Sequence, residues 1–118
     1  MIKEGHRRNT RYWGMRTVKK IARLREPVEC YSEVKGRVLF NPIIAQIEWD
    51  NPPSGDKNEF WFPYWITIDE VEKYGQYAPM IGEKALLELL RDAIRQDFFS
   101  KSFLRGLSGV LKKKLGGE

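Results

Sequence analysis

Histidine and cysteine are nearly absent from this chain of 118 residues, which has one of each, His6 and Cys30. A single cysteine excludes an internal disulfide and a zinc site built from several cysteines of one chain. Cys30 occupies an apolar position of an alternating pattern, where a buried and unreactive thiol is expected. His6 lies in a basic stretch without periodicity, and acid–base catalysis needs a base held within hydrogen-bond reach of its proton. We therefore predict no catalytic residue.

Phosphate-binding glycine loops and long apolar runs are missing as well. The chain contains neither G-x-G-x-x-G nor G-x-x-x-x-G-K-[ST], so nucleotide-driven chemistry is not expected. No apolar stretch approaches the roughly 20 residues of a membrane span, and the first residues lack the apolar core of a signal peptide. We expect a cytoplasmic protein with no membrane partner, no cofactor and no metal.

The composition that remains is that of a folded protein. Apolar residues make up 42% of the chain, aromatic residues 13% and charged residues 31%, which is far from the composition of disordered chains. The length fits one domain, residues 1–118. Residues 1–9 show no periodicity, and we predict that they form a flexible basic arm.

Residues 10–26 are the most ambiguous segment. Met15, Val18 and Ala22 follow one another at spacings of three and four, which favours a helix that Pro27 would end. Val18, Ala22 and Leu24 also belong to an alternating pattern typical of a strand. We predict the helix and keep the strand as the alternative.

Residues 28–80 alternate or turn in the manner of β-structure. Segments 28–34 and 43–49 alternate, and segment 37–40 follows a turn at Lys35-Gly36. Asn41-Pro42 is expected to break the chain before residue 43, and 50–58 is rich in turn residues. Segment 59–68, EFWFPYWITI, is the most aromatic stretch. As a strand it places Trp61 and Trp65 on one face, because successive side chains alternate. Either a terminal helix covers these two indoles, or Pro63 marks a free sheet edge at which they bind a partner.

Two helices are predicted after the sheet. Residues 83–96 carry a leucine-rich stripe, and Ser100 is the expected N-cap of a second helix that ends near Gly116. The predicted fold class is therefore α+β. It has an antiparallel sheet of about four strands over residues 28–80, with an N-terminal helix and two C-terminal helices packed on it.

Charge is distributed unevenly around a net value of +5. Residues 1–26 hold nine Lys or Arg against two Glu, residues 27–100 hold seven against thirteen acids, and residues 101–118 hold five against one. Basic ends with aromatic neighbours favour binding of nucleic acid or another polyanion without catalysis. The candidate nucleic-acid-binding residues are Arg7, Arg8, Arg11, Trp13, Arg16, Lys19, Lys20, Arg23, Lys101, Arg105 and Lys112.

Two other functions compete with this hypothesis. The first is a protein-interaction module or homo-oligomer that uses Trp61 and Trp65. The second, weaker hypothesis is a metal-dependent nuclease. It rests on a Glu33-x-Lys35 triplet and on four acids that a hairpin could bring together. These acids are Glu48, Asp50, Asp56 and Glu59.

Overall fold

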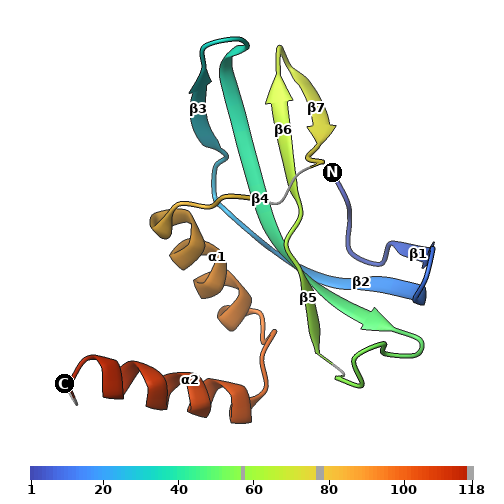
Figure 1. Ribbon diagram of the computed structural model, residues 1–118, viewed down its shortest axis with the longest axis vertical. Coiled ribbons are helices and arrows are strands. Elements are labelled where there is room, and N and C mark those ends of the chain that lie inside the picture. The colour runs from blue at the N-terminus through green and yellow to red at the C-terminus, as the bar shows by residue number, and fades with distance from the viewer. Residues whose placement is uncertain (57, 77–78, 117–118) are drawn as a thin grey trace.

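The computed structural model describes residues 1–56, 58–76 and 79–116. Its main feature is one antiparallel sheet of seven strands that curls into half a barrel (Figure 1). Two helices follow the last strand (Figure 1). In chain order the elements are β1 Arg7–Thr10, β2 Gly14–Arg23, β3 Val28–Ser32, β4 Gly36–Trp49, β5 Glu59–Trp61, β6 Tyr64–Ile68, β7 Val71–Tyr74, α1 Glu83–Arg95 and α2 Lys101–Lys114.

Strand β4, 14 residues long, organises the sheet. Its first half pairs with β3 and β6, and its second half pairs with β2 and β5. Pro42 lies where the neighbours change, and six consecutive residues, 42–47, are buried. The Asn41-Pro42 break expected from the sequence is therefore wrong. The missing N–H of proline is tolerated because it falls at the exchange of partners.

The predicted N-terminal helix is also wrong, because residues 14–23 form strand β2. Gly14, at a φ of 83°, follows the tight turn that joins β1 to β2. A register shift between Val18 and Lys20 then places both Val18 and Ile21 in the same core cluster. The spacing of Met15, Val18 and Ala22 that favoured a helix joins residues of both sheet faces, because Val18 belongs to one core cluster and Ala22 to the other.

The predicted α+β class with about four strands is wrong as well, because residues 7–23 add two strands to the sheet. The sheet begins at Arg7 and ends at Tyr74, so it contains the two N-terminal strands that the prediction left outside it. Residues 1–6 run beside β2, where the Gly5 N–H donates to the Val18 carbonyl (2.7 Å) and the Val18 N–H donates to the His6 carbonyl (2.9 Å). Met1 and Ile2 pack against the core.

The sheet separates two hydrophobic clusters. One contains Val18, Ile43 and Trp65, and the other contains Ile44 with Leu89 of α1. Helix α1 thus covers the second face and leaves the first to the strands and the N-terminal residues. Among the described residues, no helix is long and apolar enough to cross a membrane.

Both C-terminal helices form at the predicted positions, but only α1 packs on the sheet. The Ser100 hydroxyl caps α2 by accepting from the Phe103 N–H (3.1 Å). No residue of α2 is buried, and the helix points away from the sheet (Figure 1). The predicted packing of two helices on one sheet face is therefore wrong for α2.

The edge of β2 beyond β1 is closed by carboxylates. The backbone N–H groups of Ile21, Arg23 and Arg25 donate to Glu4, Asp92 and Glu88, respectively. Side chains from the first residues and from α1 thereby satisfy an edge that would otherwise be open to another strand.

Candidate nucleic-acid interface

The contact between Arg16 and Trp61 is the centre of the candidate site. Arg16 stands on β2 opposite Trp49 of β4, and Trp61 stands on β5 opposite Ala45 of the same strand. The Arg16 side chain crosses β4 and places its guanidinium carbon 4.4 Å from the centroid of the Trp61 ring. The flat cation and the indole form a cation–π contact.

Tyr74 extends this contact into an aromatic row. Its ring centroid lies 6.3 Å from that of Trp61 and 5.4 Å from that of Trp65. Trp65 is 8% exposed, whereas Tyr74 is 52% exposed. Tyr74 and Arg16 therefore cover the two indoles. In the part of the chain that the structure describes, no terminal helix covers them, and they do not lie exposed at a free edge beside Pro63.

Arg8 adds a second cation to the same face, because it is the cross-strand partner of Arg16 in the β1–β2 pair. Burial lowers the pKa of the Arg16 guanidinium, the nearby Arg8 charge lowers it further, and Tyr74 opposes these effects. Among the described residues, no carboxylate lies within salt-bridge distance of Arg8 or Arg16. Glu59 stands two residues before Trp61 on β5, and its carboxylate accepts from the Ser54 hydroxyl at 2.7 Å.

Two buried N–H groups in this region lack hydrogen bonds within the described part of the chain. They are Nε of Arg16 and Nε1 of Trp49. An unpaired buried donor costs about 1–3 kcal/mol. Sites with such costs tend to serve function, because packing alone does not favour them. We refer to the surface of Arg8, Arg16, Trp61 and Tyr74 as the arginine–tryptophan face.

The tip of the β1–β2 hairpin presents aromatic rings to solvent. Tyr12 is 73% exposed and Trp13 is 60% exposed. The guanidinium carbon of Arg11 lies 5.2 Å from the Tyr12 ring centroid. Thr10 orders the turn, since its hydroxyl accepts from the Trp13 N–H (3.1 Å) and donates to the Gly14 carbonyl (2.8 Å).

Arg7 and Lys19, two of the predicted cations, form salt bridges with acids at the end of β4. Arg7 donates to Thr17 Oγ1 at 2.6 Å and pairs with Asp50 at 3.1 Å. Lys19 pairs with Glu48 at 3.2 Å. Successive strand residues point to opposite faces, so Arg7 lies across the sheet from Arg8.

Lys20 and Arg23 support the fold. The Lys20 ammonium donates to the Gln96 carbonyl at 2.7 Å, where a cation complements the C-terminal end of α1. The Arg23 backbone N–H is bound by Asp92. Neither residue belongs to the arginine–tryptophan face.

The three C-terminal candidates, Lys101, Arg105 and Lys112, lie on α2. In Figure 1 this helix and strand β1 stand at opposite sides of the molecule. The basic ends of the chain therefore do not form one continuous groove. The structure gathers Arg8, Arg11, Trp13 and Arg16 on a single hairpin and leaves the α2 cations apart.

The acids of the nuclease hypothesis do not converge. Glu48 and Asp50 pair with separate cations, Asp56 accepts from the Asn58 N–H, and Glu33 lies in the distant β3–β4 turn. Among the described residues, no three His, Cys, Asp or Glu side chains are grouped as metal ligands would be. The arrangement gives no support to metal-assisted cleavage.

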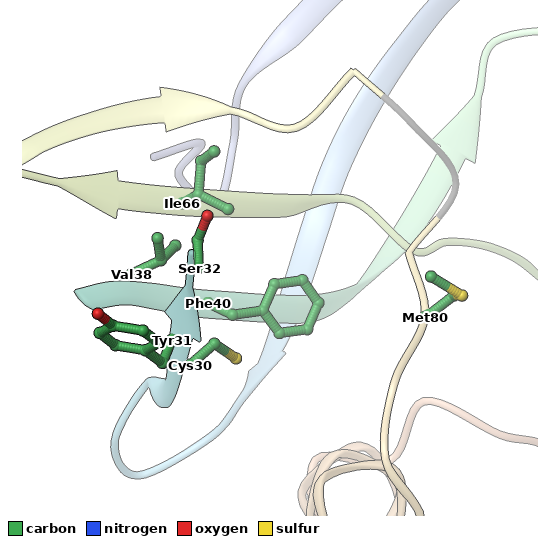
Figure 2. A pocket seen from close by; sticks show the side chains of 7 residues that line it. All are labelled: Cys30, Tyr31, Ser32, Val38, Phe40, Ile66 and Met80. Carbon is green, nitrogen blue, oxygen red and sulfur yellow. The ribbon is translucent and has the colours of Figure 1, made fainter. Parts of the chain in front are cut away.

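Cys30, expected in the core, is exposed. It borders a shallow apolar hollow of about 290 Å³ (Figure 2). Figure 2 shows it near the ring of Phe40, with Met80 set apart at the edge of the hollow. Of the described residues that line the hollow, only Ser32 and Tyr31 carry a hydroxyl group.

Tyr74 and Trp49 lie at the site but were not among the residues predicted from the sequence. A two-residue turn at Asp69 and Glu70 places Tyr74 opposite Trp65. Recognition of that hairpin would have identified Tyr74, because the turn fixes the register. Trp49 is a neighbour of Arg16 only through the β2–β4 pairing, which the predicted helix excluded.

Comparisons of the chain with models of protein families, with curated proteins and with solved structures found no match. Function is therefore inferred from the arrangement of the side chains alone.

Proposed function

We propose that this protein binds single-stranded nucleic acid through the β1–β2 hairpin and the adjoining arginine–tryptophan face. The observation that carries the proposal is Arg16, stacked 4.4 Å from Trp61 beside Arg8 and without an acidic partner among the described residues. Two neighbouring like charges that lack a counter-ion favour an anionic ligand, because the ligand relieves their mutual repulsion.

The aromatic side chains support a single strand as the ligand. Tyr12 and Trp13 are exposed at the hairpin tip, and the Tyr74 ring is half exposed on the arginine–tryptophan face. Unpaired bases stack on such rings, which contributes about 1–3 kcal/mol per base. A duplex hides its base faces, so it would use only the cations.

Arg7 and Arg8 provide a sharp test. They are adjacent on β1, but Arg7 is paired with Asp50, whereas Arg8 stands beside Arg16 without an acidic partner in the described part of the chain. We expect Arg8→Gln to weaken binding of a fluorescent single-stranded oligonucleotide by about tenfold, and Arg7→Gln to weaken it by less than about twofold. Both variants remove one positive charge, so net charge alone cannot explain a difference.

The ring contribution is tested with Trp13→Ala, since Trp13 is exposed and its loss leaves the core intact. We expect the affinity for a single strand to fall by about tenfold and the affinity for a duplex of equal length to change little. Equal losses for Arg7→Gln and Arg8→Gln, or no affinity at low salt, would refute the proposal.

Helix α2 favours a second candidate function, the binding of a protein partner. The apolar residues Phe103, Val110 and Leu111 of α2, with Leu115 just after it, are between 50% and 65% exposed, and α2 contains no acid. An apolar stripe bordered by cations fits an acidic amphipathic helix.

A screen of a peptide library against the whole protein tests this second function. Acidic amphipathic peptides should be enriched, and the enrichment should disappear with Phe103→Ser and Leu111→Ser. Leu111 is exposed, so Leu111→Ser should leave the folding stability near that of the original. Phe103→Ser also removes the stacked contact of Phe103 with Phe99 (ring centroids 4.8 Å apart), so its folding is checked separately. Enrichment that survives both substitutions would exclude α2 as the binding surface.

A further inference from the structure

A second basic surface lies on the other side of the β2 edge, between the end of β2 and α1. It is a groove of about 830 Å³. Five cations line it, together with Leu24 and Leu87. The cations are Arg23, Arg25, Lys84, Arg91 and Arg95. Of these five, only Arg23 was a predicted site residue. We refer to this region as the β2–α1 groove.

The spacing of residues along α1 explains how one wall forms. Lys84, Glu88, Arg91 and Arg95 follow one another at intervals of four, three and four, which places them on one stripe of the helix. The opposite wall is the end of β2, whose backbone N–H groups at Arg23 and Arg25 donate to Asp92 and Glu88 of α1 at 2.9 and 2.8 Å.

These hydrogen bonds engage both acids of the groove. Glu88 is bound to the Arg25 backbone, and Asp92 accepts from the Arg23 backbone, from Gln96 and from Arg95. In contrast, no carboxylate among the described residues lies within salt-bridge distance of the side chains of Arg25, Lys84 or Arg91. Five cations therefore line the groove against two acids, and these three make no salt bridge within the described part of the chain.

We propose that the β2–α1 groove binds consecutive phosphate groups. Guanidinium groups bind phosphate oxygens in pairs of parallel hydrogen bonds, and an ammonium binds them as a point charge. The groove exceeds the size of one phosphate, and its unpaired cations come from both walls. The ligand chemistry is a chain of phosphates, from either a free polyphosphate or a phosphodiester backbone.

This site is distinct from the arginine–tryptophan face, and its existence does not depend on the function proposed above. Its lining residues include no aromatic side chain, so it offers no aromatic ring on which a base could stack. Binding there should consequently be insensitive to base identity and to the presence of bases at all.

Calorimetric titration with sodium tripolyphosphate at low salt tests the proposal. The groove variant Arg25→Ala with Arg91→Ala keeps both backbone N–H groups, so the bonds to Glu88 and Asp92 can persist. The matched control is Arg105→Ala with Lys112→Ala on α2, which removes the same charge. We expect the groove variant to lose at least about tenfold in affinity and the control to lose less than about threefold.

A single-stranded oligonucleotide titrated against the same proteins separates the two phosphate sources. If the groove variant weakens both ligands, the groove binds phosphodiester backbone as well; if it weakens tripolyphosphate alone, the ligand is a free polyphosphate. Both results support the site. Lack of tripolyphosphate binding by the original protein, or equal losses in the two double variants with intact circular dichroism, would overturn it. Failure of the hairpin proposal would appear in Arg8→Gln and leave the tripolyphosphate titrations unchanged.

Discussion

The guanidinium of Arg16 lies 4.4 Å from the ring centroid of Trp61, so one contact joins residues that the sequence assigned to two different hypotheses. Arg16 was a candidate for nucleic acid, and Trp61 was a candidate for a protein partner. On adjacent parts of a curled sheet they form a single surface with a cation and stacked rings. That combination suits a ligand that has both phosphates and aromatic bases.

Replacing Arg16 should separate binding from stability. Arg16→Met keeps the aliphatic stem over Trp61 and removes the cation, the repulsion from Arg8 and the unpaired Nε. Loss of the cation–π contact costs about 0.5–1 kcal/mol, and removal of an unpaired buried donor returns about 1–3 kcal/mol. We expect the free energy of unfolding in urea to rise by roughly 1 kcal/mol while oligonucleotide affinity falls. A less stable Arg16→Met that binds normally would show that Arg16 has a structural role.

The salt dependence of binding should count the phosphates in contact. If Arg8, Arg11 and Arg16 each neutralise one phosphate of a single strand, the slope of log K against log salt is about −2. Arg8→Gln should then reduce its magnitude by about 0.7. Fluorescence anisotropy over a series of salt concentrations measures both values. A slope near −4 in the original protein would mean that about three further cations take part.

The C-terminal helices could be predicted from the sequence because their signals are local. Ser100 caps α2 by a bond to a residue three positions on, and the leucine stripe of α1 repeats every three or four residues. Strand β2 depends instead on its pairing with other strands, above all with the distant β4. The spacing of Met15, Val18 and Ala22 that favoured a helix joins residues that pack on opposite faces of the sheet. The local sequence pattern therefore failed to predict β2, because the pairing with another strand determines its structure.

The candidate site could be predicted residue by residue but not as a surface. Arg8, Arg16 and Trp61 were all named in advance, each for its own chemistry. Their contact requires β2 and β5 to flank the same strand, β4, and the proline-containing middle of β4 was expected to be a break. Without that strand, Arg16 and Trp61 had no predicted geometry in common.

Protonation of Asp92 should weaken the fold at low pH. Burial alone raises the pKa of this carboxyl, but hydrogen bonds from Arg95, the Arg23 backbone and Gln96 outweigh burial and lower it. Because the folded pKa lies below the unfolded one, the ionised group stabilises the fold above the unfolded pKa, and this contribution disappears as pH falls through the folded value.

Asp92→Asn tests this dependence. We expect the variant to be about 1 kcal/mol less stable at pH 7. The difference should remain constant above the ordinary carboxyl pKa of about 3.9 and narrow as pH falls below it, through the lower pKa of the folded state. Urea midpoints across that range provide the measurement. A difference that stays the same at every pH would attribute the effect to hydrogen bonding without charge.

Gly75 should tolerate no side chain, and Gly106 should accept one. A Cβ on Gly75 would overlap the ring of Tyr64, which packs against this buried glycine. The Gly75 N–H also donates to the Tyr64 carbonyl at 2.8 Å, so the backbone cannot move away without losing a hydrogen bond. Gly75→Ala should destabilise the protein by about 1–3 kcal/mol, as overpacking does elsewhere.

Gly106 is the matched control because a Cβ there meets nothing within 4 Å, and the residue lies inside α2. Gly106→Ala should stabilise α2 by about 0.5–1 kcal/mol, since alanine favours a helix over glycine. Because α2 buries none of its residues, this gain should appear as slower amide hydrogen exchange within α2, with little change in the urea midpoint of the sheet. A rise in that midpoint equal to the gain in helix stability would mean that α2 unfolds together with the sheet.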